Sequence, residues 1–293
     1  MKGGQEFSWE YRKENEQNFT GQPTSKSASS TRLNFKVISA TKNNYIIELS
    51  FGETTILDEN QAKALKESPL AWVSEYAKAL RIRISLDKNG QFEGIVNFDE
   101  LRKKNAEVMP KLFASLKSMK APGYGTQASA RLEKQLLSLY DTREGLESIF
   151  STPLGLIIFA MGQTWDTQTP FEYTTTLPNF LGGDPLEADG VVSVKSFNKK
   201  KNSAVLVNTM KISKESFSKM IGDSAKQFGN GKTNSEKASA AEETVAVAKG
   251  VDILDETTYM IDLKSGLTMR AKFVRRAIVP GGYRLMSEGI DRI

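Results

Sequence analysis

The chain contains no histidine and no cysteine among its 293 residues. Without cysteine there are no disulfide cross-links and no thiol nucleophile. Without histidine the most common general base is missing, and the two absences together exclude ordinary zinc and haem sites. Acid–base chemistry would have to use Asp, Glu, Lys or Tyr, so the composition favours binding over catalysis.

Long apolar runs and a strong net charge are also missing. The most apolar window covers residues 154–161, far shorter than the roughly 20 residues that a membrane-spanning helix needs, so we predict no transmembrane segment. The net charge of +5 is mild for this length, and we expect no nucleic-acid partner. The densest basic run, Lys199-Lys200-Lys201, is interpreted as a solvated hairpin turn.

The common signatures of nucleotide and metal sites are absent. The sequence has neither a Gly-x-x-x-x-Gly-Lys phosphate loop nor a Gly-x-Gly-x-x-Gly fingerprint. Asp184, Glu187 and Asp189 form the best acidic cluster, in the segment 182–190. Their spacing does not match a calcium-binding EF-hand. We therefore predict a solvated loop there, with no metal and no cofactor.

The N-terminal third has the alternation of half-buried strands. Phe7, Trp9 and Tyr11 alternate with polar residues, and two further alternating pairs predict hairpins over residues 33–49 and 82–96. The second pair turns at Asn89-Gly90, the strongest short-range hairpin signal. The Ser- and Thr-rich residues 21–30 predict a loop, and residues 58–65 and 69–80 predict helices.

A helical block follows. Apolar residues recur at three- and four-residue steps over residues 98–119, and helices are also predicted over 132–140 and 141–150. Asn97 and Glu100 have the spacing of a capping box. Pro110 predicts a kink or a break at Met109.

In the C-terminal part, apolar and polar residues alternate again, as in strands. Strands are predicted over 171–175, 191–197 and 204–210, and a helix over 213–228. Four closing strands, 244–253, 257–263, 267–279 and 283–290, are separated by short reversals, the first of them at Asp255-Glu256. Short reversals require antiparallel pairing, because a parallel neighbour needs a long crossover.

Strands, then helices, then strands indicate the α+β class. We predict one α+β domain over 1–293, with a curved antiparallel β-meander sheet or sheets and a central helical block packed on one face. The N-terminal strands and helices span 5–97, the helical block 98–161, and the C-terminal antiparallel strands 162–293.

Two groups of residues are candidates for a site. The three tryptophans, Trp9, Trp72 and Trp165, could line a ligand groove or simply fill a core. A glycosidase-like hydrolase would need two facing carboxylates about 5 to 10 Å apart. The candidate carboxylates for such a pair are Asp166, Glu172, Asp252 and Asp262.

At Gly162 and Trp165 the chain resembles a family of exported bacterial proteins of unknown function, often periplasmic or lipoproteins, which carry a Gly-Asp-x-Trp motif. Gln163 replaces the acid of that motif here. The turn at Asp262, Ser265 and Gly266 is similar to the family's Asp-x-x-Thr-Gly turn, with Ser in place of Thr. No signal peptide is visible at the N-terminus, so the resemblance implies a periplasmic or cell-surface location if such a segment was removed. It implies no catalytic residues, and we interpret the Gly–Trp pair as a corner that fixes the fold.

These patterns favour a non-enzymatic exported protein that holds an apolar or lipid-like ligand between the curved sheet and its helical cover. Two alternatives stay open. One is a cell-envelope module that binds another protein through sheet edges or loops. The other is a carboxylate-based hydrolase.

Overall fold

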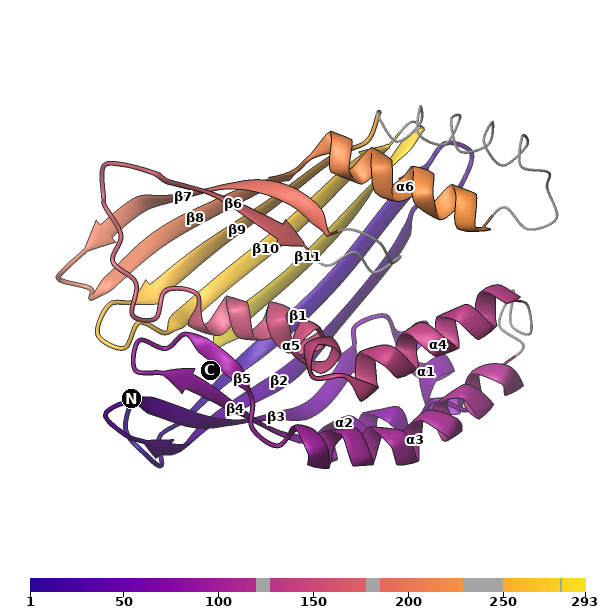
Figure 1. Ribbon diagram of the computed structural model, residues 1–293, viewed down its shortest axis with the longest axis horizontal. Helices are drawn as coiled ribbons and strands as arrows, with labels where there is room; N and C mark the ends of the chain where they lie inside the picture. Colours follow the sequence, from indigo (N-terminus) through magenta and orange to yellow (C-terminus); the bar gives the residue numbers. More distant parts are fainter. Residues whose placement is uncertain (120–126, 178–184, 229–249, 280) are drawn as a thin grey trace.

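The computed structural model describes residues 1–119, 127–177, 185–228, 250–279 and 281–293. Within these ranges, eleven strands form one antiparallel sheet in the order β5-β4-β3-β2-β1-β11-β10-β9-β8-β7-β6 (Figure 1). The predicted class, α+β with an antiparallel meander, is confirmed. It takes the form of a single large sheet.

The sheet consists of two meanders. The first contains β1 (Glu6–Phe19), β2 (Ser25–Ala40), β3 (Asn44–Ile56), β4 (Arg81–Asp87) and β5 (Phe92–Ile95). The second contains β6 (Phe171–Leu177), β7 (Leu186–Asn198), β8 (Ser203–Ile212), β9 (Asp252–Asp262), β10 (Thr268–Val279) and β11 (Gly282–Arg292). The first runs from the centre of the sheet to one edge, and the second runs from the other edge back to the centre, where β1 pairs with β11.

Helices connect and cover the meanders. They are α1 (Glu59–Glu67), α2 (Val73–Ala79), α3 (Phe98–Ser118), α4 (Gln127–Asp141), α5 (Arg143–Ile158) and α6 (Lys214–Phe228). The segment from α3 to α5 links the edge strand β5 to the other edge strand β6, and it lies against one side of the sheet (Figure 1). We call this side the inner face and the opposite side the outer face.

The core lies between α5 and the inner face. Trp9, Phe35 and Ile47 are each 0% exposed and share one cluster with Leu146 and Ile157 of α5. Because successive side chains of a strand point to opposite faces, the buried apolar residues at alternate positions of β1 to β4 share the inner face. Burial of an apolar side chain of this size contributes about 1.5–3 kcal/mol.

Part of the inner face is charged, which the sequence patterns did not predict. Next to the apolar zone, Asp255 and Glu288 are 2% and 4% exposed. Arg275 donates to both oxygens of Asp255, from Nε at 2.7 Å and from Nη2 at 2.6 Å. Glu288 accepts from the Tyr11 hydroxyl at 2.5 Å and pairs with Lys13 Nζ at 3.0 Å. We call these five residues the inner ionic cluster.

That cluster explains one wrong prediction. Asp255-Glu256 is not a reversal: β9 continues through it, because Arg275 on β10 pairs with the inward-pointing Asp255 carboxylate.

Residues 25–30 were predicted to be part of a loop, but they are strand. They pair with the polar second half of β1, from Gln17 to Arg12, where Ser and Thr fit the ladder.

Three other local predictions also differ from the structure. Asn97 does cap α3 by position, but its side-chain oxygen accepts from Arg83 N of β4 and not from the helix backbone, and its Nδ2 donates to Glu100 Oε2 at 3.3 Å. The helix α3 runs through Pro110 from Phe98 to Ser118, so the predicted break at Met109 is absent, while the alternative of a kink stays a prediction. Glu187 and Asp189 lie in β7, while Asp184 falls outside the described residues.

Other predicted elements are confirmed, whereas most of the predicted strand over 244–253 lies outside the described residues, and β9 begins at Asp252. The two N-terminal hairpins, the helix over 213–228 and the turn at Lys199–Lys201 are present. Among the residues that the structure describes, no helix is long and apolar enough to cross a membrane.

Candidate aromatic groove between the sheet edges

A pocket of about 400 Å³ lies where the C-terminal end of α5 meets both edges of the sheet. Phe92 of the edge strand β5 and Phe171 and Tyr173 of the edge strand β6 line it, together with Phe159 and Trp165. A second pocket, of about 310 Å³, shares Trp165 and Phe171 with the first. We call the surface formed by these five aromatic residues the aromatic groove.

The aromatic rings form a chain that starts in the core and ends at the surface. Buried Tyr259 stacks on Phe159 with ring centroids 4.2 Å apart, and Phe159 stacks on Trp165 at 5.6 Å. Trp165 meets Phe171 edge-on at 6.2 Å, and Phe171 stacks on Tyr173 at 6.1 Å. Aromatic pairs at these separations attract each other beyond simple area burial. The chain therefore holds the outer rings in defined positions.

Two rings of the aromatic groove are exposed. Phe171 is 57% exposed and Phe92 is 38% exposed. Large apolar side chains that cluster at a concave surface mark sites for apolar partners or ligands. In the structure the two phenylalanines lie on the two edge strands, at opposite ends of the strand order.

Two glycines allow the close packing around the groove. Gly162 has φ +63°, and a β-carbon there would lie 2.0 Å from the carbonyl oxygen of Asn89. Gly190 is the Cα partner of Tyr173, and a β-carbon there would lie 2.1 Å from Cζ of that ring. Gly162 thus fits the corner that the sequence predicts, just before Trp165.

The polar groups of the groove are few. Trp165 Nε1 is buried and has no hydrogen-bond partner within the described part of the chain. Asp166 lines the second pocket, and hydrogen bonds from the backbone amides of Gln168 and Thr169 hold its pKa below its usual value. Tyr173 donates its hydroxyl to Asn208 Oδ1 on β8 at 2.9 Å.

The structure does not bring the three tryptophans to one groove. Trp9 is 0% exposed in the core, and its Nε1 donates to the carbonyl of Thr268 at 2.8 Å. Trp72 precedes α2, donates to Ser115 Oγ at 3.3 Å, and has Lys111 Nζ 4.5 Å from its ring centroid. Trp165 alone of the three lines one of the pockets described here. Phe92 and Phe171 were not candidates, because a sequence does not show that two edge strands flank one helix end.

The four candidate carboxylates do not gather around one cleft. Asp252 and Asp262 stand at opposite ends of β9. Asp262 accepts from Asn202 Nδ2 and from Ser265 Oγ in the turn before β10, and Asp252 lies 3.8 Å from Lys214 Nζ. Glu172 is an exposed residue of β6. Among the described residues, no group of three or more acids could hold a metal ion.

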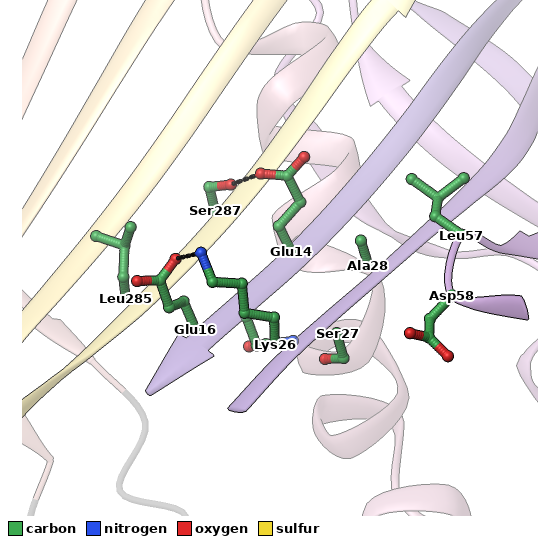
Figure 2. Close-up of a pocket in the computed structure, with 10 residues that line it drawn as sticks. Glu14, Glu16, Lys26, Ser27, Ala28, Leu57, Asp58, Leu285 and Ser287 are labelled. Atoms are coloured by element: carbon green, nitrogen blue, oxygen red, sulfur yellow. Dashed lines mark hydrogen bonds and ion pairs between the residues drawn. The ribbon is translucent and has the colours of Figure 1, made fainter. Parts of the chain in front are cut away.

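A pocket of about 410 Å³ also lies on the outer face (Figure 2). Its side chains are largely paired: Glu14 accepts from Ser287 Oγ at 3.1 Å, and Glu16 contacts Lys26 Nζ at 2.9 Å. Hydrogen bonds from Tyr283 and Lys26 hold the pKa of Glu16 below its usual value. Its charged residues are Glu14, Glu16 and Asp58 against the single cation Lys26, and no aromatic ring lines it, so this net negative pocket suits an apolar ligand less well than the aromatic groove does.

No family model matches the chain, and no curated protein matches it. A solved structure described as "Lipid-protein interactions in lipovitellin" is similar, with a TM-score of 0.42 and 9% sequence identity. The match covers 100% of this chain and 25% of that one. The chain thus spans about a quarter of its length, and the likeness is too low to assign a fold or a function.

Proposed function

We propose that this protein binds an apolar or lipid-like ligand, and that the aromatic groove is where the apolar part of the ligand binds. The observation that carries the proposal is the exposure of Phe171 and Phe92 at the mouth of a 400 Å³ pocket. That volume falls within the range of about 300–1,000 Å³ for small-molecule sites. Exposing such rings to water costs free energy, which an apolar ligand would recover.

The pocket between α5 and the sheet that the sequence suggested is less suited. The fully buried inner-face side chains of β1 to β4, such as Trp9, Phe35 and Ile47, are 0% exposed and share one cluster with residues of α5. Interiors packed in this way contain few voids. We therefore assign the ligand to the place where this packing ends.

The first experiment is extraction. Protein purified without detergent is extracted with organic solvent, the extract is analysed by mass spectrometry, and the stripped protein is titrated with a long-chain alcohol. We expect a bound apolar molecule or a saturable titration. An empty extract together with no saturable binding would contradict the proposal.

A matched pair of variants locates the site. Phe171→Ser removes a ring of the groove, and Phe197→Ser removes a similarly exposed ring, 48% against 57%, near the Lys199–Lys201 turn. We expect Phe171→Ser to weaken binding about fivefold to tenfold, the loss of roughly 1–1.4 kcal/mol of apolar contact, and Phe197→Ser to leave it unchanged. Equal effects of the two would show that the ligand lies elsewhere.

Export is part of the same proposal. The resemblance at Gly162 and Trp165 supports a location in the periplasm or at the cell surface. Fractionation of cells that express the native gene tests it, and recovery in the cytoplasm alone would contradict it.

A protein-binding role is the second candidate, and β6 favours it. This edge strand is seven residues long and contains no lysine and no proline, the residues that usually protect an edge from a further strand. A photo-reactive residue in place of Glu172 should then capture a partner in cells, whereas one in place of Thr55 on β3 should not. Equal or absent capture at the two positions would rule this role out.

A further inference from the structure

Three cations lie close together on the inner face beyond the cover of α5. They are Lys13 on β1, Arg275 on β10 and Arg284 on β11. Met286 of β11 is the reference point. Arg275 is its Cα partner on β10, and Arg284 lies two residues before it on β11. Lys13 on β1 is the Cα partner of Glu288, which lies two residues after Met286. Alternate residues of a strand share a face, which places these side chains on the same side as Tyr11 and Ile290.

The counter-ions of this group are more deeply placed than the cations. The Asp255 and Glu288 side chains are 3% and 5% exposed, whereas those of Arg275 and Lys13 are 36% and 43% exposed. Arg275 uses Nε and Nη2 on Asp255, which leaves Nη1 for another acceptor. Lys13 has one ion pair, to Glu288, and its ammonium group has three donors.

Arg284 provides the uncompensated charge. It is exposed, and within the part of the chain that the structure describes it has no ion pair. Its Cα partners are Gln17 and Ala277, neither of which is an acid. The two buried acids and three cations therefore leave one net positive charge on this surface.

One row of residues leads from the aromatic groove to these cations. Tyr173 donates to Asn208. Asn208, Thr257, Phe273, Glu288 and Lys13 are then successive Cα partners from β8 to β1. From β6 to β11, which carries Met286 and Arg284, there are five strand spacings, or about 24 Å at ~4.8 Å each. A lipid chain fills about half of the roughly 30 Å hydrocarbon core of a bilayer, so a chain whose polar end lies at Met286 covers more than half of the distance to the groove.

We infer that the ligand is an anionic amphiphile, whose carboxylate or phosphate group binds Arg284, Arg275 and Lys13 above Met286 while its apolar chain extends toward the aromatic groove. This inference rests on the proposed function and adds the chemical class of the ligand. Guanidinium groups bind carboxylate and phosphate oxygens in matched geometry. In Figure 1 the strands β1, β10 and β11, which carry these cations, are seen between α5 and α6.

The test compares three probes on one protein. Hexadecanoic acid, hexadecan-1-ol and inorganic phosphate are titrated separately, below their aggregation limits, by calorimetry. We expect the acid to bind at least about fivefold more tightly than the alcohol, and phosphate to bind far more weakly than the acid. Equal binding of acid and alcohol would overturn the anionic class and leave the proposed function standing. If neither the acid nor the alcohol binds, both the anionic class and the proposed function are overturned. If phosphate binds as tightly as the acid, the ligand needs no apolar chain, and the inference of an amphiphile is overturned.

Two variants make the result specific. Arg284→Gln removes the exposed cation of the inner face, and Arg276→Gln makes the same change on the outer face of the neighbouring strand β10. We expect Arg284→Gln to weaken binding of the acid about fivefold and to change binding of the alcohol less than twofold. Arg276→Gln should change neither. Equal effects of the two variants on the acid would overturn the assignment, and thermal melting of both checks that they are folded.

Discussion

At the scale of single residues, the corner between α5 and β6 requires a glycine at position 162. We expect Gly162→Ala to destabilise the protein by about 2–4 kcal/mol, because it adds a left-handed backbone strain to a clash with the Asn89 carbonyl. Urea unfolding measures the change.

Gly155 is the matched control. It lies within α5, and a β-carbon there would meet nothing within 4 Å. Gly155→Ala should therefore raise stability by up to about 1 kcal/mol, the difference in helix propensity. A loss of similar size at both positions would contradict the role of the corner.

The pair of Asp255 and Arg275 makes a second prediction at this scale. Arg275→Met leaves the buried Asp255 carboxylate without its bidentate partner, and we expect a loss of about 3 kcal/mol in the free energy of unfolding. The double variant Asp255→Leu with Arg275→Met should recover most of it, since no buried charge is left unpaired. If the double variant were as unstable as the single one, the charges themselves would be needed for the fold.

Single residues also show where sequence patterns lose information. Asn89-Gly90 has one common meaning, a tight turn, and the structure has Gly90 at φ +82° there. Asp255-Glu256 was predicted to be a turn, because isolated acids are rare inside sheets. It is part of a strand because Arg275, on another strand, pairs with Asp255, and a local sequence pattern does not show that partner. Trp165 could be named as a candidate from its sequence, but Phe92 and Phe171 became candidates only through the fold.

At the scale of elements, α3 has an internal proline that does not interrupt it. The helix runs from Phe98 to Ser118, and Pro110 is exposed. Pro110 has no amide hydrogen to donate to the preceding turn. We expect Pro110→Ala to stabilise the protein by about 1–3 kcal/mol, as measured by thermal or urea unfolding. A destabilised variant would show that the proline sets a bend on which packing depends.

Alternation and turns predicted most strands, because each hairpin is encoded by local residues. The extent of β2 was missed: its first residues are Ser and Thr, whose strand conformation comes from the partner strand β1 and not from their own side chains. Helix α5 was predicted only to residue 150, since its second half is apolar on nearly every side, as expected of a helix buried against the sheet.

At the scale of the whole molecule, the absence of histidine shapes the dependence of stability on pH. No side chain has an ordinary pKa between pH 5 and 8, so we expect the melting temperature to be nearly constant over pH 6–8. Loss of stability should begin above pH 10. Burial raises the pKa of Tyr76 to about 12 and also raises the pKa values of Tyr11 and Tyr259.

The sign follows from proton binding. Between the unfolded pKa near 10 and the raised folded values, the native state holds protons that the unfolded chain has released, so stability falls as pH rises. Thermal melting from pH 6 to 11 measures it, and Tyr11→Phe should reduce the slope above pH 10. A marked change between pH 6 and 8, or an unchanged slope in the variant, would contradict this account.

The pairing of β1 with β11 also determines how long β1 waits for its second partner strand during synthesis. Trp9 and its hydrogen-bond partner Thr268 are separated by 259 residues, which a ribosome adding roughly 5–20 residues per second takes about 13–52 s to make. During that interval β1 has only β2 beside it, and its other edge stays open in the crowded cell. The central seam of the sheet therefore cannot close until β11 has been synthesised.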